Sequence, residues 1–519
     1  MHLSHLFQRT VNMHADRPAL ATGMAAPLTY AAFAARVNAL AHLLRDGLRL
    51  RPGDRVGIAM KNCAQYAEAM WACWSAQLCV VPVNNKLHPK EVAYILEDSQ
   101  ARLCISQGPF LEELRQCAAA NGPEFLDVNG PQWQSPGNPA APLHAAHSGS
   151  HRADELAWLF YTSGTTGKPK GVMLTHANLV AMALNFHADM LAIDSDDALI
   201  HVAPMSHGSG LYGIPYVMRG GLQVVSESGG FDEAELTHLL QGYGKASLFA
   251  APTIVTRMVQ HVRSSGQALT GLRNFLVGGA PFYAEDIKQA VHTFGARVAQ
   301  MYGQGETPMT ISAIRCEKLA QAVHDDNADV LSSVGYPQTT VDVRIEDEGG
   351  IEQPPGALGE IVVYGATVMQ GYWNNEAATA KTLVNGGLRT GDVGLVDANG
   401  LLHLRDRSKD VIISGGTNIY PREVEDALLC HPAVQEVSVI GTHDDDWGEV
   451  VTAIVVAHGE VTDAELDATC IERIARFKRP KRYIYLQHLP KNPTGKVLKN
   501  ELRSLAAKAA GLPTRGERT

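Results

Sequence analysis

The stretch from Leu156 to Thr175 constrains this chain more strongly than any other segment. Two short apolar runs within it, Leu156 to Phe160 and Val172 to Leu174, are bounded by glycine and proline. This pattern predicts two strands joined by a loop. The ten residues from Thr162 to Gly171 include three glycines, four aliphatic hydroxyls and two lysines. Glycines let backbone N–H groups approach a ligand, hydroxyls donate hydrogen bonds and lysines add charge, so the loop is expected to hold several phosphate oxygens.

Two other interpretations of this loop are weaker. A Walker A motif needs Ser or Thr directly after Gly-Lys, whereas Pro169 follows Lys168 here. A plain surface hairpin with two solvated lysines is the other alternative. So dense a set of glycines, hydroxyls and lysines is unusual for a simple turn. The composition therefore favours the anion site.

Length, charge and cysteine content set broad limits. A chain of 519 residues with 45% hydrophobic residues predicts two or more domains with large cores. Its formal net charge of −10 gives no basis for nucleic-acid binding, which needs a basic face. The eight cysteines are scattered without a CxxC pair or a His/Cys cluster, so we expect reduced thiols and a cytoplasmic protein.

No secretion signal or membrane segment is expected. Polar residues interrupt the first 18 positions before a signal-peptide core could form. The longest apolar segment, Ala67 to Val83, contains Glu68, Gln77 and Pro82 and is too short to span a bilayer. It predicts a buried helix that runs into a strand.

The first hundred residues alternate between helical and strand-like patterns. We expect helices at Tyr30 to Leu44 and Cys63 to Ser75, and strands at Arg55 to Met60 and Cys79 to Val83. Such alternation predicts an α/β domain with a largely parallel sheet. Residues 121 to 155 are rich in Pro, Gly, Ala, Ser and His and lack periodicity, so a connecting loop is expected there.

A glycine-rich segment follows the phosphate loop. Thr175 is expected to cap a helix over His176 to Leu191, and Leu199 to Ala203 is expected to be a strand. The strand runs into Pro204, Met205, Ser206, His207, Gly208, Ser209 and Gly210. A histidine among glycines is usually a solvated loop residue. From the residues alone, a solvated and a functional His207 remain equally open.

The segment from Asn274 to Thr307 predicts a βαβ unit. A strand at Asn274 to Val277 leads into the turn Gly278 to Pro281, and a helix then precedes a strand at Arg297 to Met301. A second turn is expected over Tyr302 to Glu306. In open α/β sheets ligands bind beyond the carboxyl ends of strands, where both turns fall. A carboxylate there suits magnesium beside a triphosphate, although Glu306 alone could be an exposed loop acid.

The last third of the chain changes in character. Strand-like runs over Val341 to Tyr364 predict a small β-subdomain. Asp392 could accept two hydrogen bonds from a ribose diol and Arg407 could donate to the same sugar, but Asp392 alone is as consistent with a turn. The remaining stretch of about 110 residues is the size of a small domain. Lys496 follows Pro-Thr-Gly, where a lysine is normally a solvated loop charge.

In their order along nearly the whole chain, these motifs resemble those of the adenylate-forming superfamily, which includes acyl- and aryl-CoA synthetases, firefly luciferase and peptide-synthetase adenylation domains. The chain is most similar to the acyl-CoA synthetases. The resemblance implies an α/β fold with a large multi-subdomain N-terminal α/β domain, residues 1–407, that includes a small β-subdomain. It also implies a small mobile C-terminal α+β domain, residues 408–519.

The resemblance also assigns roles to residues. It implies that Lys496, Glu306 and His207 are catalytic, that Glu306 binds Mg²⁺ and that Lys409 is the interdomain hinge. The implied ATP- and AMP-binding residues are Thr162, Ser163, Gly164, Thr165, Thr166, Lys170, Gly279, Ala280, Pro281, Met301, Tyr302, Gly303, Gln304, Gly305, Asp392 and Arg407. The implied acyl pocket consists of His207, Gly208, Ser209, Gly210, Tyr212, Gly213, Val277 and Gly278. Coenzyme A is expected at Gly415, Gly416, Lys478 and Arg479, since a run of cations can attract its phosphates.

Two departures from the family pattern bear on function. Gly305 stands where the family has a threonine that donates to the α-phosphate, a loss of about 0.5–1.5 kcal/mol that Thr307 or a water could offset. The aspartate that pairs with an ammonium in peptide-synthetase domains has no counterpart near His207. An α-amino acid substrate is therefore disfavoured.

The implied reaction has two steps. A carboxylic acid, fatty or aromatic, reacts with Mg·ATP to give acyl-AMP and pyrophosphate, and the thiol of coenzyme A then displaces AMP. Free coenzyme A is favoured because only 23 residues follow Lys496, too few for a fused carrier domain. The alternatives are an acyl-AMP ligase that loads a separate carrier protein and a catalytically weak nucleotide-binding regulator. A homodimer is compatible with the sequence.

Overall fold

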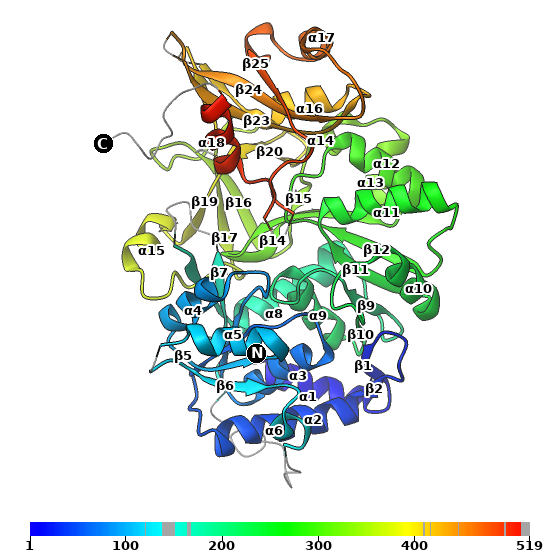
Figure 1. The fold of residues 1–519 in the computed structure, drawn as a ribbon, viewed down its shortest axis with the longest axis vertical. Helices are drawn as coiled ribbons and strands as arrows, with labels where there is room; N and C mark the ends of the chain where they lie inside the picture. The colour runs from blue at the N-terminus through cyan, green and yellow to red at the C-terminus, as the bar shows by residue number, and fades with distance from the viewer. Residues whose placement is uncertain are drawn as a thin grey trace.

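The computed structural model describes residues 1–119, 121–136, 151–162, 168–407, 410–415, 417–444, 446–492 and 495–509, with only the backbone of residues 407 and 509. The chain forms a large α/β body and a smaller α+β lid, which stands at the top of Figure 1 in orange and red. The lid begins after β20 (Leu402–Arg407), the last strand of the large body.

The first sheet holds the predicted phosphate loop between two of its strands. Its order is β6-β5-β3-β4-β7-β8, parallel except for the last pair. The bounds are β3 (Arg55–Ile58), β4 (Cys79–Pro82), β5 (Ala101–Ser106), β6 (Glu124–Asp127), β7 (Leu156–Thr162) and β8 (Lys170–Thr175). Helices α2 (Tyr30–His42), α3 (Ala64–Ser75), α4 (Pro89–Asp98) and α5 (Gly108–Cys117) accompany it. The helices and strands expected before residue 106 are confirmed.

Helix α3 shows why the longest apolar segment does not mark a membrane span. Every residue from Tyr66 to Ser75 is buried, and Trp71 and Trp74 meet edge to face with ring centroids 4.9 Å apart. A helix that is apolar on all sides belongs in the core of a large domain. Among the described residues, no helix combines the length and apolarity needed to cross a membrane.

The second sheet supplies most of the candidate site. Its order is β15-β14-β13-β12-β11-β9-β10-β1-β2, with β1 and β9 to β13 parallel. The bounds are β1 (Pro18–Thr22), β2 (Leu28–Thr29), β9 (Ala198–His201), β10 (Leu222–Val225), β11 (Ala246–Ala250), β12 (Leu272–Val277), β13 (Val298–Gln304), β14 (Thr307–Ile314) and β15 (Tyr336–Pro337). The largest hydrophobic cluster contains residues from both sheets, so the two sheets share one core.

Helices pack on both faces of the second sheet. Helix α8 (His176–Asn185) contacts β7 and β8 of the first sheet and β14 of the second, so it lies between them. As expected, Thr175 caps it: Oγ1 accepts from the backbone N–H of Asn178. The other helices of this region are α1 (Leu3–His14), α9 (Gly208–Met218), α10 (Glu233–Tyr243), α11 (Pro252–Ser265), α12 (Ala284–Phe294), α13 (Cys316–His324) and α14 (Ala328–Ser332).

Two sequence-based expectations in the large body were wrong. The predicted loop over 121–155 contains the edge strand β6 and the one-turn helix α6 (Pro131–Gln134), whose Trp133 is buried. Both elements are too short to show periodicity. The predicted turn over Tyr302 to Glu306 is also shorter than expected. Strand β13 continues through Gln304 because Tyr302 pairs with Ser312 of the antiparallel β14.

A smaller antiparallel sheet forms the predicted β-subdomain. Its order is β16-β17-β19-β18, with β20 paired to β19. The bounds are β16 (Val341–Glu346), β17 (Gly359–Gly365), β18 (Leu383–Val384) and β19 (Gly387–Val396), with α15 (Glu376–Thr382) before β18. The register places Asp392 of β19 opposite Arg407 of β20. The two predicted ribose-binding positions are therefore neighbours in the backbone.

The lid has its own sheet and its own cores. The sheet order is β22-β21-β24-β23, with β25 paired to β24. The bounds are β21 (Ile412–Ser414), β22 (Thr417–Ile419), α16 (Pro421–Leu429), β23 (Val434–Asp444), β24 (Gly448–Ala457), α17 (Asp463–Arg473), β25 (Arg482–Tyr485) and α18 (Lys499–Ala509). Two clusters of buried residues lie entirely after residue 411. The sequence did not predict α18, which begins three residues after Lys496.

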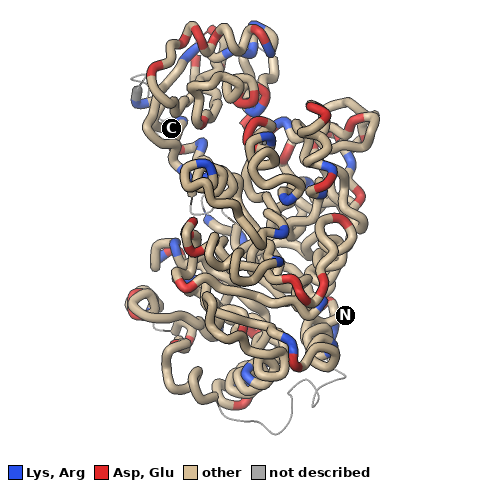
Figure 2. The backbone as a smooth tube through the Cα atoms, turned by 90° about the vertical axis from the view of Figure 1, so that its right-hand side faces the viewer, with Lys and Arg blue, Asp and Glu red and all other residues tan. Residues whose placement is uncertain are grey.

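Charged residues of both signs alternate along the backbone. Figure 2 shows Lys and Arg interspersed with Asp and Glu over the large body and the lid. Several of the cations are engaged in ion pairs, such as Lys478 with Glu423 and Arg479 with Asp467. The expected absence of nucleic-acid binding stays a prediction.

Candidate active site

A cleft of about 680 Å³ lies between the large body and the lid. Its volume is typical of small-molecule sites. From the large body it is lined by the turn after β12, by the end of β13 and by β19 and β20; from the lid it is lined by the segment around Lys496. The predicted site residues on its walls are Gly279, Ala280, Pro281, Met301, Tyr302, Gly303, Gln304, Asp392 and Lys496.

Glycine is required in the turn after β12. Gly279 has φ of +87°, a conformation that side chains disfavour. At Gly278 a Cβ atom would lie 2.1 Å from Sδ of Met301, so a side chain there would require the Met301 side chain to move. The turn therefore packs tightly on β13 and presents its backbone to the cleft.

Asp392 is held in place by two side chains of β13. Oδ2 accepts a 2.6 Å hydrogen bond from Oη of Tyr302 and a 2.7 Å hydrogen bond from Nε2 of Gln304. The same amide of Gln304 donates to the carbonyl of Thr390. Asp392 is buried, and its carboxylate lies at the cleft wall. The orientation of this acid is thus fixed before any ligand binds.

Glu306 and Lys170 come together through a tyrosine that sequence reasoning missed. Oη of Tyr372 donates a 2.8 Å hydrogen bond to Oε1 of Glu306. Nζ of Lys170 lies 4.6 Å from the centroid of the Tyr372 ring. Burial, followed by the Glu306 carboxylate, raises the pKa of Tyr372, so the phenol keeps its proton and stays a donor. Tyr372 therefore contacts both a predicted phosphate-binding lysine and a predicted metal-binding acid.

Close packing explains why Gly305 replaces the family's threonine. A Cβ atom at position 305 would lie 2.7 Å from Cδ1 of Phe160 and 3.0 Å from Cγ2 of Thr162. The backbone thus approaches the end of β7 too closely for a side chain. Thr307 does not take over the missing contact, because it is fully buried and its hydroxyl is used by Thr310 and Thr367.

His207 is half-buried and neutral. It is the N-cap residue of α9, its Nδ1 lies 2.9 Å from Oγ of Ser206, and its ring meets Phe160 edge to face at 5.1 Å. Burial lowers the pKa of His207 to about 4. Because Phe160 also contacts position 305, the histidine lies next to the turn that carries Glu306. A fully solvated loop histidine is excluded.

The predicted acyl-pocket residues fall into two groups. Positions 208 to 213 belong to α9, and a Cβ at Gly208 would lie 3.0 Å from the Phe249 ring and 2.5 Å from Sδ of Met309. Tyr212 stacks edge to face on the same Phe249 at 5.7 Å. Val277 instead belongs to the hydrophobic cluster on the opposite face of the sheet. The structure thus brings the helical residues together and places the Val277 side chain away from them.

The lid carries Lys496 to the cleft on a tight turn. The backbone N–H of Lys496 donates to Oδ1 of Asn492, and the N–H of Asn492 donates to the carbonyl of Lys496, both at 2.8 Å. Gly495 has φ of +87°, and a Cβ there would lie 3.2 Å from Oγ1 of Thr253 in α11. The glycine lets the turn press against the large body. Asn492 was missed because no sequence pattern marks it.

Two of the predicted coenzyme A residues form ion pairs with acids of the lid. Nζ of Lys478 lies 2.6 Å from Glu423, and Nη1 of Arg479 lies 2.6 Å from Asp467. Gly415 has φ of +57° and packs under the Trp447 ring, which is 49% exposed. None of Gly415, Lys478 and Arg479 is among the described residues that line the cleft.

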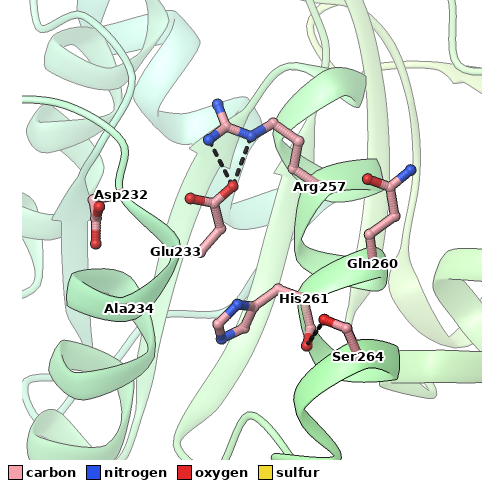
Figure 3. Close-up of a pocket in the computed structure, with 7 residues that line it drawn as sticks. All are labelled: Asp232, Glu233, Ala234, Arg257, Gln260, His261 and Ser264. Atoms are coloured by element: carbon pink, nitrogen blue, oxygen red, sulfur yellow. Dashed lines mark hydrogen bonds and ion pairs between the residues drawn. The ribbon is translucent and has the colours of Figure 1, made fainter.

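A second hollow, of about 480 Å³, lies between α10 and α11 (Figure 3). Its guanidinium group is paired, because Nη2 of Arg257 lies 2.6 Å from Oε1 of Glu233. Arg257 and Gln260 also line the main cleft, so the hollow adjoins it. Within the described residues the hollow has no group with an evident chemical role.

Several predicted residues lie outside the described part of the chain. These are Ser163, Gly164, Thr165 and Thr166 of the phosphate loop, Lys409, Gly416 and the side chain of Arg407. Thr162 and Lys170 mark the two ends of the phosphate loop and are paired across β7 and β8.

Comparison with known proteins identifies the family. The profile of the AMP-binding enzymes matches residues 7–373, and that of the AMP-binding enzyme C-terminal domain matches residues 423–496. A feruloyl-CoA synthase from Amycolatopsis sp is 36% identical over 92% of this chain and 93% of that protein. The fatty acid–[acyl-carrier-protein] ligase ScoC from Streptomyces coeruleorubidus is 33% identical over 92% of this chain and 91% of that protein.

A solved structure supports the same family. That of o-succinylbenzoate CoA synthetase (MenE) from Bacillus subtilis, in complex with its acyl-adenylate intermediate OSB-AMP, matches with a TM-score of 0.83 and 30% identity. The match covers 96% of this chain and 97% of that one. The fold and both domain profiles agree, and the chain belongs to the family of AMP-binding enzymes.

Proposed function

We propose that the chain is an AMP-forming acid–thiol ligase that converts a carboxylic acid to its coenzyme A thioester. The observation that carries the proposal is the arrangement of one cleft: Lys496 of the lid, the turn Gly279 to Pro281 and Asp392 all line it. The feruloyl-CoA synthase and the CoA synthetase from Bacillus subtilis support this reaction class.

The first step joins two anions. A carboxylate oxygen attacks the α-phosphorus of ATP, the bond to the pyrophosphate oxygen breaks, and acyl-AMP and pyrophosphate form. Two unit charges 4 Å apart repel by about 4 kcal/mol at an effective dielectric of 20. The ammonium of Lys496 offsets much of this repulsion, and Lys170 stabilises charge on the departing pyrophosphate. Asp392, oriented by Tyr302 and Gln304, holds the ribose hydroxyls.

The residues present fit a magnesium ion. Mg²⁺ in nucleotide sites is usually held by one or two carboxylates, phosphate oxygens and waters. Oε1 of Glu306 is fixed by Tyr372, which leaves the carboxylate positioned to bind. When bound, Mg²⁺ would neutralise charge on the triphosphate.

The acid is proposed to have a neutral tail, fatty or aromatic. The imidazole beside the site is neutral, because burial lowers the pKa of His207 to about 4. Phe160, Phe249 and Tyr212 supply aromatic surface around α9. None of these side chains is a carboxylate that could pair with the ammonium group of an α-amino acid. The relatives named for ferulic and fatty acids are consistent with either kind of tail.

In the second step a thiolate attacks the acyl carbon, the bond to AMP breaks, and the thiol proton passes to solvent. Coenzyme A is the proposed thiol. Trp447 is a further candidate contact for coenzyme A beside Gly415, because it is partly exposed and Nζ of Lys481 lies 3.9 Å from its ring centroid. A carrier-protein thiol is the second candidate, and the relative ScoC favours it.

One assay tests the proposal. Aryl, short, medium and long carboxylic acids are each incubated with Mg·ATP, and pyrophosphate release is measured with no thiol, with coenzyme A or with a phosphopantetheinylated carrier protein. Acid-dependent pyrophosphate release followed by acyl-CoA formation supports the proposal. Thioester only on the carrier protein would replace coenzyme A with the second candidate. A protein that binds ATP but releases no pyrophosphate with any acid would be the nucleotide-binding regulator.

The cellular setting is proposed as cytoplasmic. All eight cysteines are free in the structure, and most are buried. Burial raises the pKa of Cys73, Cys79 and Cys104, so these thiols stay protonated and unreactive at neutral pH. Such thiols suit a reducing compartment. A homodimer stays a prediction, which a mass measurement in solution would test.

A further inference from the structure

The C-terminal helix α18 holds both flanks of the predicted hinge. Nζ of Lys499 lies 3.4 Å from Oδ2 of Asp406, which belongs to the last strand of the large body. One helical turn later, Nη2 of Arg503 donates a 2.6 Å hydrogen bond to Oδ1 of Asp410. Asp406 precedes and Asp410 follows the position of Lys409. We call Lys499, Arg503, Asp406 and Asp410 the clasp.

The helix that supplies the two cations is fixed to the lid. Leu502 and Ala506, on the apolar side of α18, are buried in a cluster with Ile440, Ile454 and Leu489. Because Asp406 belongs to a strand of the large body, the pair of Lys499 with Asp406 joins the lid to that body. The side chain of Asp410 is only 10% exposed and that of Arg503 23%, so water screens this pair weakly.

A second link reinforces the first. Glu425 in α16 is buried, lies 3.4 Å from Nζ of Lys499, and accepts a 2.9 Å hydrogen bond from Oη of Tyr283 in the large body. Burial works to lower the pKa of Lys499, but the carboxylates of Glu425, Asp406 and Asp410 outweigh it and raise this pKa. The lysine is thus charged and surrounded by acids from both sides of the boundary.

We infer that the clasp holds the lid in the orientation that places Lys496 in the cleft, and that Lys499 and Arg503 are positioning residues for the adenylation step. Lys496 and Lys499 are three residues apart on one continuous segment, so fixing the helix fixes the catalytic lysine. Turning the lid away requires breaking the pair between Lys499 and Asp406 and the bond between Tyr283 and Glu425. The part of this inference that concerns rates rests on the proposed function.

Arg503 is the informative position, because it does not line the cleft among the described residues. Its bond to Asp410 lies within the lid and acts through the helix, since it fixes α18 in the place from which Lys499 reaches Asp406. Arg503→Ala should lower ATP–pyrophosphate exchange about fivefold or more, the range of a typical coupling between two states. Thioester formation from pre-formed acyl-AMP should change less than twofold, since that step does not use Lys496. Arg503→Lys, which keeps the charge, should retain most of the exchange. Arg344→Ala, which removes a 2.7 Å ion pair with Asp342 inside the β-subdomain, is the matched control.

A readout independent of catalysis comes from the hinge sequence, which offers trypsin sites after Arg405, Arg407 and Lys409. Limited trypsin digestion of the folded protein should cut there several-fold faster in Arg503→Ala than in the wild type, Arg503→Lys or Arg344→Ala. Hinge cleavage at the wild-type rate, or equal loss in both half-reactions, would overturn the clasp. If the wild type showed no exchange with any acid, the proposed function would fail while the digestion still decided the clasp.

Discussion

The hydroxyl of Tyr372 donates a 2.8 Å hydrogen bond to the carboxylate of Glu306, while its ring supports the ammonium of Lys170 at 4.6 Å. One aromatic side chain therefore sets the separation of two groups that are expected to meet the triphosphate. The hydroxyl and the ring make separable contributions, because substitution by phenylalanine removes the first and keeps the second.

Tyr372→Phe should lower the adenylation rate about 2- to 13-fold, the effect of losing one hydrogen bond of about 0.5–1.5 kcal/mol. Because the lost bond orients Glu306, the Mg²⁺ concentration for half-maximal exchange should rise as well. Initial rates of exchange measured against Mg²⁺ concentration check this. An unchanged Mg²⁺ dependence would separate Tyr372 from Glu306 function. Thr379→Val, next to the Tyr372 backbone N–H but not to Glu306, is a suitable control.

Restoring the family's threonine should not improve the enzyme. In Gly305→Thr the new Cβ would lie 2.7 Å from Cδ1 of Phe160, so β7 or the turn must move. Overpacking of this kind typically costs about 1–3 kcal/mol. We expect a lower melting temperature and slower exchange. The double variant Gly305→Thr with Phe160→Leu should recover stability, and a single variant as stable as the wild type would show that the turn adapts freely.

Motifs and their order along the chain predicted which segments form the site, but not which side chains contact one another. The turn after β12 and the ends of β7 and β13 fall at carboxyl ends of strands, where α/β topology places ligand contacts. Tyr372 was missed because it is 66 residues from Glu306 and no local pattern marks a hydrogen bond over that separation. Position 305 was marked as unusual, but its cause, contact with Phe160, exists only in three dimensions.

The coenzyme A contacts expected at Lys478 and Arg479 stay a prediction. Lys478 and Arg479 belong to a run of cations that suggested phosphate binding, yet in the structure each is paired with an acid of the lid. Sequence shows the charge of a residue but not its partner. Helix α18 was missed for a related reason: its polar face is explained only by Asp406 and Asp410, some 90 positions earlier.

A cluster of histidines predicts loss of stability in acid. The rings of His2 and His176 lie 3.5 Å apart and both are buried, with His5, His151, the N-terminal amine and Glu155 around them. Burial is the main reason that the pKa of His176 is lowered to about 3, and the nearby charges of His151, the N-terminus and His5 add to it. The pKa of His2 is lowered further, first by burial and then by His176 and His151.

Both histidines are neutral in the folded protein and protonate near pH 6.5 when unfolded. The contribution of the two neutral histidines to the free energy of unfolding is therefore complete above pH 6.5 and is lost as the pH falls from 6.5 toward 3. At pH 5 the loss from His176 alone is about 2 kcal/mol. Urea unfolding at pH 7.5, 6 and 5 measures it, and His176→Gln should flatten the slope. A slope unchanged in that variant would assign the acid sensitivity to other groups.

Lys496→Ala tests the proposed mechanism most directly. The repulsion between a carboxylate and the α-phosphate, about 4 kcal/mol at 4 Å and an effective dielectric of 20, must be offset in the first step. The second step has no such requirement, because its electrophile is an acyl phosphate and its nucleophile a thiolate. The variant should therefore lose adenylation by a factor of about 10² or more, which corresponds to about 2.7 kcal/mol of transition-state stabilisation.

The same variant, supplied with pre-formed acyl-AMP and coenzyme A, should form thioester at close to the wild-type rate. Lys491→Ala is the matched control on the same turn, since Nζ of Lys491 pairs with Glu436 at 2.7 Å within the lid. If Lys496→Ala lowered both half-reactions together, the lysine would either serve both steps or support the fold. A melting temperature equal to that of the wild type would then show that it serves both steps. If neither half-reaction fell, another cation of the cleft would have to carry the charge of the first step, and Lys499, three residues further along, would be the next to substitute.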